Sequence, residues 1–247
     1  MLRFLLEVYT YFELEAMLSS PWKDPATLDL VTTEKCLEIL AEDENDDFLF
    51  GYLIDLYKMI PLISQLGVLR RRELAGEEGL DCTTRYEVLW AKIYNWQAPI
   101  QDGDDATEVS DSTRMAVNTA MILHNFLIIL LECFYYQNRE AQKSLGQQMG
   151  LFIDHTLSLF VSVTEYSASA ILFWPLMVIG CYAQSADQQA TIRRILLSRK
   201  ASLRMPVLDR GIEVLGWVWS EVVDNELVGL ECLEHVVAVR GTDICLA

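Results

Sequence analysis

Proline and glycine are scarce in this chain, at 6 and 12 of its 247 residues. Disordered segments are enriched in both residues, and proteins built from many short strands need them in their turns, so the scarcity argues against either class. Hydrophobic residues make up 52% of the chain and charged residues 22%. This composition predicts an all-α fold, a single compact multi-helix domain with long buried helices, over residues 1–247.

Positive charge is also in short supply. Lys and Arg number 19 against 36 Asp and Glu, which gives a formal net charge of −17. The one basic run, residues 70–72, is followed at once by Glu73 and is interpreted as a solvated helix end rather than a nuclear-import signal. Nucleic acids and anionic membranes bind clustered cations, so we expect no direct nucleic-acid binding by this chain and no membrane binding.

Cysteine pairs with metal-binding spacing are missing. The six cysteines lie at positions 36, 82, 133, 181, 232 and 245, and none belongs to a Cys-x-x-Cys pair. Zinc sites and redox dithiols use such pairs, whereas isolated cysteines among apolar neighbours are typical of reduced thiols in an intracellular protein. We therefore expect no bound metal and no cofactor.

One hydrophobic run is long enough to be tested as a membrane span. Residues 166–183 carry no charge, but Glu165 borders the run, Pro175 interrupts it, and no positively charged flank accompanies it. We interpret the run as a buried, kinked central helix.

Three- and four-residue spacing of apolar residues predicts most of the helices. The first covers residues 2–18, and its apolar face consists of Leu2, Leu5, Leu6, Tyr9, Phe12 and Ala16. A helix over residues 84–96 is expected to have an inner face made of Tyr86, Leu89, Trp90 and Ile93.

Capping signals and prolines predict where helices begin or break. Thr84 with Glu87, and Ser185 with Gln188, have the spacing of capping boxes. Pro61 is expected to kink or divide the segment 50–74, and Pro206 to stand at the beginning of a helix.

Signatures of catalysis are absent as well. The sequence contains no Gly-x-Ser-x-Gly elbow, phosphate-binding loop or dinucleotide fingerprint. His124 lies in an apolar helix and is interpreted as a core histidine, with an acid/base residue or a polar anchor for a ligand as the alternative. If the chain were an enzyme, the first residues to substitute would be His124, His155 and Glu132.

Large aromatic side chains are the more informative set, because on helices they line pockets for apolar small molecules as well as fill ordinary cores. Six tryptophans occur, several on helices expected to be buried. The candidate ligand-binding residues are Trp90, His124, Phe126, Phe173, Trp174, Met177 and Trp217. For each of them, ordinary core packing is the alternative interpretation.

Four segments of the chain carry a resemblance to a known family. They are 50–74, where Phe-Gly leads into a helix ending in Arg and Glu; 86–99, with a Leu-Trp pair and a terminal Trp-x-x-Pro; the His-containing helix 116–131; and 172–181, an apolar-Pro-apolar run ending in Gly-Cys. A Trp-rich helix, 212–219, follows. In order and spacing these segments resemble the fungal-specific transcription factor domain that follows the zinc cluster of many fungal regulators.

This resemblance extends from about residue 2 to residue 223. It implies an all-α regulatory domain in nucleus and cytoplasm, a homodimer that binds an apolar small-molecule effector, protein partners, or both. It supplies no catalytic residues, and the family's N-terminal Cys-x2-Cys-x6-Cys cluster and basic linker do not occur in this sequence. The alternative is a headless relative that acts as a biosynthetic cyclase or isomerase on an apolar intermediate of secondary metabolism.

Overall fold

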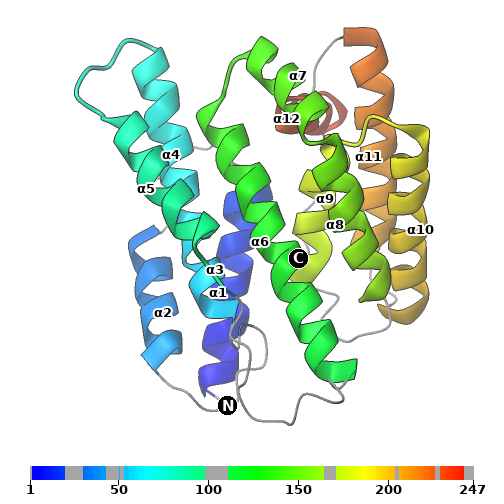
Figure 1. The fold of residues 1–247 in the computed structure, drawn as a ribbon, viewed down its shortest axis with the longest axis horizontal. Helices are drawn as coiled ribbons and strands as arrows, with labels where there is room; N and C mark the ends of the chain where they lie inside the picture. The colour runs from blue at the N-terminus through cyan, green and yellow to red at the C-terminus, as the bar shows by residue number, and fades with distance from the viewer. Residues whose placement is uncertain are drawn as a thin grey trace. The chain divides into compact units, whose positions relative to one another are not determined.

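The computed structural model describes residues 2–19, 30–42, 50, 53–97, 111–163, 171–203, 206–225 and 229–241. All regular structure within these ranges is helical, which confirms the all-α prediction (Figure 1). The helices are α1 (Leu2–Ser19), α2 (Leu30–Glu42), α3 (Ile54–Tyr57), α4 (Met59–Leu74), α5 (Cys82–Tyr94), α6 (Asp111–Tyr135), α7 (Arg139–Gln148), α8 (Gly150–Ser162), α9 (Phe173–Cys181), α10 (Ala186–Leu203), α11 (Pro206–Asn225) and α12 (Gly229–Arg240).

The described helices form two compact units. Unit 1 contains α1 to α5 and the last part of α6, from Leu127 onward, while unit 2 contains the first part of α6, up to Phe126, and α7 to α12. The division therefore falls inside a continuous helix, and each unit uses separate stretches of the chain. This arrangement explains why the sequence shows no domain boundary.

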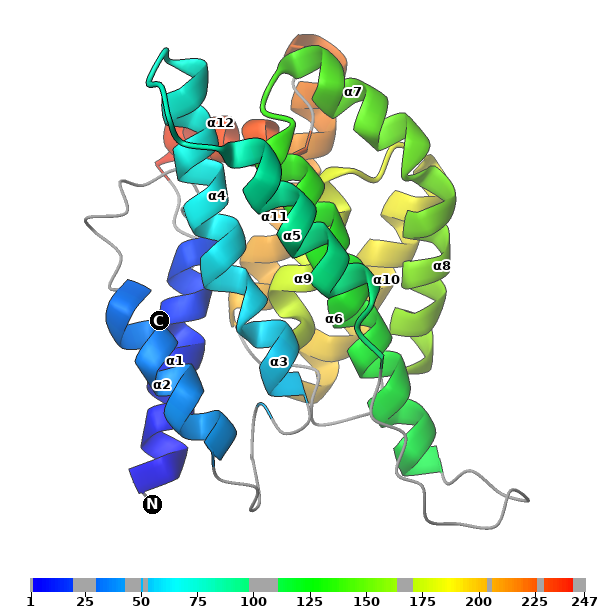
Figure 2. The same ribbon diagram turned by 60° about the vertical axis from the view of Figure 1, so that its left-hand side comes forward.

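Unit 1 is built around α1, which packs against α2 and α4, while α4 also packs against α5 (Figure 2). Its core consists of side chains that are almost fully buried, among them Leu14, Met17, Leu37, Leu40, Ile60, Ile63 and Leu66. Burying each such side chain stabilises the fold by about 1.5–3 kcal/mol relative to leaving it in water.

The orientation of α1 differs from the sequence prediction. Most of the expected apolar face is turned to solvent, since Leu2, Leu5, Tyr9 and Phe12 are all exposed. The buried face instead combines Leu14, Met17 and Leu18 with the polar residues Glu7, Thr10 and Glu15. Two of these buried polar residues have polar partners. Glu7 forms an ion pair with Arg3 at 3.5 Å, and the Thr10 hydroxyl donates to the carbonyl of Leu6 at 2.7 Å. The spacing of apolar residues had predicted that the opposite face of α1 packs against the core.

Pro61 and Pro175, the two prolines expected to interrupt helices, lie in the first turn of a helix. Pro61 is the third residue of α4, which is separated from α3 at Lys58, so the predicted division of this segment is confirmed. Pro175 is the third residue of α9 and lies in the first turn of that helix. Prolines are tolerated there because the first four backbone N–H groups of a helix have no intrahelical acceptor. Residues 166–170 of the predicted central helix lie outside the described residues.

The two predicted capping boxes have different outcomes. At the beginning of α10, the backbone N–H of Gln188 donates to Ser185 Oγ at 3.1 Å, and that of Ser185 donates to Gln188 Oε1 at 3.2 Å, so this box is confirmed. The amide of Gln188 also donates to Asp154 Oδ1 of α8 at 2.8 Å. The Thr84 box is wrong, because α5 begins at Cys82 after Asp81 and has no side-chain cap. Pro206 begins α11, as predicted.

The core of unit 2 is α9, in which every side chain is buried. It packs against α10, α11 and α12 (Figures 1 and 2). Trp219 of α11 fixes one of these contacts by donating its indole N–H to the carbonyl of Gly180 at 2.9 Å. The uncharged sequence of α9 is thus explained by burial on all sides.

Helix α6 is the one described helix that is long and apolar enough to cross a membrane. The segment Thr113–Tyr135 has 23 residues, and 67% of its most apolar window is buried inside the protein. Core helices of water-soluble proteins pass the same test of length and composition.

Candidate binding groove

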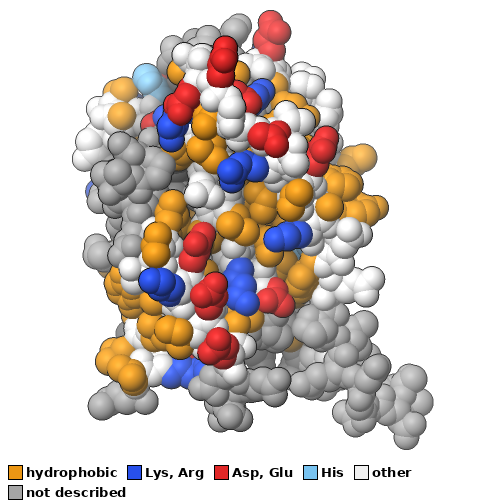
Figure 3. All heavy atoms as spheres, turned by 90° about the vertical axis from the view of Figure 1, so that its left-hand side faces the viewer, with side chains coloured by type: hydrophobic (Ala, Val, Ile, Leu, Met, Phe, Trp, Pro, Cys, Tyr) orange, Lys and Arg blue, Asp and Glu red, His pale blue; other side chains and the backbone are white. Residues whose placement is uncertain are grey.

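A groove lies in unit 1 between α4 and α5, with a volume of about 230 Å³. Helix α4 contributes Leu62, Gln65 and Leu66, and α5 contributes Thr84, Arg85, Val88, Leu89 and Lys92. Leu66 and Leu89 are buried and form an apolar floor, while Val88 is half exposed. Figure 3 views the side on which α4 and α5 lie in Figure 1, where both basic and acidic side chains are scattered among hydrophobic ones.

The short connection between α4 and α5 brings the two helices side by side. Gly76 and Gly79 adopt φ values of 98° and 83°, which favour glycine because other residues are strained in this region. Arg72 and Glu77 form an ion pair across the connection. The turn reverses the chain, so that α5 runs back along α4 and the groove lies between them.

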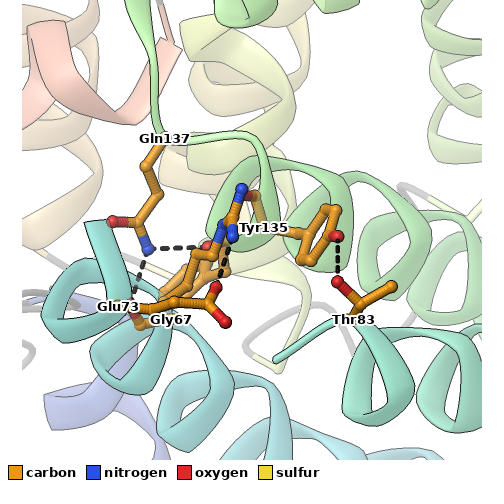
Figure 4. Close-up of polar contacts among 7 residues, drawn as sticks. Gly67, Glu73, Thr83, Tyr135 and Gln137 are labelled. Carbon is orange, nitrogen blue, oxygen red and sulfur yellow. Dashed lines mark hydrogen bonds and ion pairs between the residues drawn. The ribbon is translucent and has the colours of Figure 1, made fainter. Parts of the chain in front are cut away.

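A group of polar contacts joins α4 to the end of α6 (Figure 4). The Arg70 guanidinium forms an ion pair with Glu73, donates to the backbone carbonyl of Tyr135 at 3.3 Å, and lies 4.8 Å from the centre of the Tyr135 ring. The Gln137 amide donates to the carbonyls of Gly67 and Phe134, both at 2.6 Å. These contacts fix α4 on one side of α6.

Helix α5 is held to the same end of α6 by two tyrosines. Tyr86 donates its hydroxyl to Glu132 Oε1 at 2.6 Å, and its ring stacks on Tyr135 at 4.1 Å between centroids. The hydroxyls of Thr83 and Tyr135 are hydrogen bonded at 3.1 Å (Figure 4). Tyr86 and Thr83 thus set the rotation of α5 about its axis, which determines the face turned to the groove.

Burial is the main influence on the pKa values of Glu132 and Tyr86. The pKa of Glu132 is raised mainly by burial, and the hydrogen bond from Tyr86 lowers it in part. The pKa of Tyr86 is raised well above its usual value, first by burial and then by its bond to Glu132. Tyr86 is therefore the donor throughout the physiological range, and Glu132 is the acceptor.

Two cations flank the groove. Arg85 and Lys92 are seven residues apart, which places them two helical turns apart on one face of α5, a rise of about 10 Å. Neither forms an ion pair with any residue in the described part of the chain, whereas Arg70 and Arg72 are paired. The groove therefore presents an apolar floor with two positive charges and the polar side chains of Gln65 and Thr84 around it.

The predicted ligand-binding residues of α9 lie in the core of unit 2. Phe173, Trp174 and Met177 are each at most 2% exposed. The rings of Phe173 and Trp174 meet edge to face at 5.7 Å, and both Phe173 and Met177 approach Gly211 of α11 closely. Phe126 is fully buried. The contacts of these four side chains within the described residues are with other core residues, so their predicted ligand-binding role stays a prediction.

The other predicted ligand-binding residues lie on three different helices, Trp90 in unit 1 and His124 and Trp217 in unit 2. Trp90 is 41% exposed on α5, stacks on Tyr94 at 4.7 Å, and does not line the groove, so its predicted place on the inner face is wrong. His124 is half buried and stacks on Trp96 at 5.7 Å. Trp217 lies beneath the Arg240 guanidinium, 5.3 Å from its ring centre.

The three residues named for an enzyme are divided between the two units. Glu132 belongs to unit 1 and accepts the Tyr86 hydrogen bond, while His124 and His155 belong to unit 2, where His155 is exposed on α8. Among the described residues, no group of three His, Cys, Asp or Glu side chains could hold a metal ion.

The groove residues were missed by the sequence analysis. Arg85, Val88 and Lys92 follow each other at three- and four-residue steps, so they share one face of α5. That spacing predicts a shared helix face. It predicts a groove only when α4 is known to lie beside this face.

The described part of the chain is therefore helical, with a groove of about 230 Å³ between α4 and α5. A comparison with known protein families matches residues 1–247, the whole chain, to the fungal-specific transcription factor domain. The chain therefore belongs to this family, as the sequence resemblance indicated. Membership indicates a regulatory role in transcription, carried out by a nuclear or other intracellular protein. Searches of curated proteins and of solved structures find no match to the chain.

Proposed function

We propose that this chain is the effector-sensing domain of a fungal transcription regulator, and that its effector binds in the α4–α5 groove. The effector class that the groove fits is a small molecule with an apolar body and an acid group. The domain acts in the nucleus or cytoplasm as a homodimer, and it responds to the effector instead of binding nucleic acid itself.

The observation that supports the proposal is the pairing of an apolar floor with two available cations. Leu66 and Leu89 favour an apolar body by the area they remove from water. Arg85 or Lys92 favours a carboxylate, since charge-assisted hydrogen bonds are stronger than neutral ones. In a chain with a net charge of −17, two such cations beside one groove give it a local charge opposite to that of the whole.

The size of the groove limits the effector. Its volume of about 230 Å³ lies below the about 300–1,000 Å³ of ordinary small-molecule sites. The groove therefore favours a compact aromatic or aliphatic acid.

The groove also offers a route from binding to regulation. Thr84 and Arg85 line the groove. They lie in sequence between Thr83 and Tyr86, whose hydroxyls hold α5 to α6. An effector that draws the two groove walls together favours one rotation of α5 over another. Differential affinity for two such arrangements is what a regulatory ligand needs in order to shift their populations.

The direct test is binding of small carboxylic acids by titration calorimetry, with each acid compared with its neutral amide. We expect the acids to bind and the amides to bind at least about tenfold more weakly, the factor given by one lost charge-assisted bond. The double variant Arg85→Gln/Lys92→Gln should lose the preference for the acid. The matched control, Lys143→Gln/Arg194→Gln, removes two exposed cations elsewhere and should keep it.

A reporter assay tests the regulatory part. The chain is fused to an unrelated DNA-binding domain, and transcription is measured with and without the acid that binds. We expect the acid to change reporter output in the wild type and in the control variant, but not in Arg85→Gln/Lys92→Gln. An acid-dependent response that survives the loss of both cations would contradict the assignment of the groove.

A further inference from the structure

The exposed face of α1 carries an unusual amount of hydrophobic surface. Five large apolar side chains of this helix lie in solvent: Leu2 is 83% exposed, Phe4 46%, Leu5 57%, Tyr9 42% and Phe12 45%. We call Leu2, Leu5, Tyr9 and Phe12 the α1 stripe. Single exposed hydrophobic residues are normal on protein surfaces, but a contiguous patch on one helix marks an interaction site.

The spacing of the α1 stripe is that of a helix–helix seam. Its residues follow one another at steps of three, four and three, and Ala16 extends the series by a step of four. Alternation of three and four is the a/d pattern through which two helices pack along their length. No charged residue occurs within the stripe, so a helix laid along it meets only apolar groups.

Within the described part of unit 1, α1 uses a face other than the stripe for its helix–helix packing. α1 packs on α2 and α4 through its other face, which includes Leu14, Met17 and Leu18. That face also buries Glu7, Thr10 and Glu15.

We propose that the α1 stripe is a self-association surface, and that its partner is the α1 stripe of a second copy of this chain. A stripe with an a/d pattern is complementary to itself when two copies are related by a two-fold axis, since each patch then faces its own image. This inference rests on the proposed function in one respect: it gives the homodimer a surface.

Charge and area both favour a second copy over other occupants. Two copies carry −17 each, so they repel one another through most of their surfaces, and an uncharged strip is where they can meet at least electrostatic cost. From the fractional exposures, the five side chains present roughly 500 Å² of apolar surface in total, given that an aromatic side chain buries about 150–250 Å². Pairing two copies then removes at most roughly 1,000 Å² from water, the size of a weak, reversible interface. The helix is already formed, so pairing carries no cost of folding it.

The experiment is sedimentation velocity over a range of concentrations, on the full chain with any purification tag at its C-terminus. The wild type is expected to dimerise reversibly. The double variant Leu5→Glu/Phe12→Glu should raise the dimer dissociation constant by at least about 100-fold, because each substitution occurs twice in the interface. The matched control Val31→Glu/Ile39→Glu places the same charges on exposed hydrophobic positions of α2 and should leave the dimer unchanged.

Both substituted side chains are exposed, so the fold should survive, and circular dichroism checks this. If the double variant unfolds, the milder pair Leu5→Gln/Phe12→Gln replaces it. A wild type that stays monomeric at about 100 µM, well above the weak-dimer range, overturns the proposal. An α1 variant that dimerises as the wild type does also overturns it.

The two proposals fail separately. Carboxylic-acid binding to the α4–α5 groove is measured in the same α1 variants by the calorimetric assay. Loss of the dimer with acid binding retained supports the stripe alone, and retained dimerisation with no acid binding contradicts the groove alone.

Discussion

Replacing Gly67 by alanine tests the packing that fixes α4 on α6. A Cβ at this position would lie 1.9 Å from Cδ1 of Phe134, and 2.8 Å and 2.9 Å from two further atoms of the same ring. Phe134 is fully buried, so its ring cannot turn into solvent to make room. The carbonyls of both residues accept hydrogen bonds from Gln137, so a shift of either backbone also weakens those bonds (Figure 4).

The expected cost follows from two opposing terms. Overpacking a well-packed core costs about 1–3 kcal/mol, and a required shift of more than 1 Å lies at the upper end of that range. Alanine gains about 1 kcal/mol over glycine within a helix. We therefore expect Gly67→Ala to lower the free energy of unfolding by about 2 kcal/mol.

The assay is urea denaturation followed by circular dichroism, with Gly216→Ala as the matched control. Gly216 also lies within a helix, α11, but the nearest atom to its added Cβ is Nη2 of Arg193 at an ordinary 3.6 Å. That variant should be more stable than the wild type by up to about 1 kcal/mol. In a Phe134→Leu background, where the ring is gone, Gly67→Ala should lose most of its cost. A Gly67→Ala protein as stable as the wild type would refute the reasoning.

Three further substitutions test buried polar groups by the same denaturation assay. Burial raises the pKa of Glu15 from 4.5 to about 7, so the Glu15 contribution to stability should be fully present below pH 4.5 and be lost as pH rises to 7. Relative to the wild type, Glu15→Gln should gain up to about 3 kcal/mol at pH 8 and less at low pH. A stability difference between the two proteins that does not change with pH would contradict this assignment. Trp219→Phe removes the bond to the Gly180 carbonyl and should cost about 1 kcal/mol, whereas an unchanged midpoint would mean that the bond contributes nothing. Tyr86→Phe leaves Glu132 without its donor and should cost about 1–3 kcal/mol near neutral pH, with a smaller loss at a pH where Glu132 is protonated.

Features that depend on neighbouring residues were predictable from the sequence. The capping box of Ser185 and Gln188 needs only the spacing of two residues, and the start of α11 needs only Pro206. The capping box at Thr84 failed because Gly79 and Asp81 adopt positive φ and let α5 begin earlier, at Cys82. Backbone freedom of that kind is not visible in a two-residue pattern.

Features that depend on which helix lies next to which could not be predicted. Periodicity gives α1 an apolar face but does not say whether that face meets the core or another molecule. The groove has the same origin, since Arg85 and Lys92 border a binding site only because Leu62 and Leu66 of α4 lie alongside. For the aromatic residues of α9, sequence correctly located a hydrophobic centre, but a ligand pocket and a filled core have the same composition.

The side chain of Gln188 uses both ends of its amide. Its oxygen accepts from the backbone N–H groups of Gln184 and Ser185, and its nitrogen donates to Asp154 and, at 3.4 Å, to the carbonyl of Gly150. Glutamate has no donor to offer and would face a second carboxylate, leucine has neither group, and asparagine is shorter by one methylene. Substitutions of Gln188 should therefore be poorly tolerated in evolution. The reason would be structural and independent of any ligand or partner.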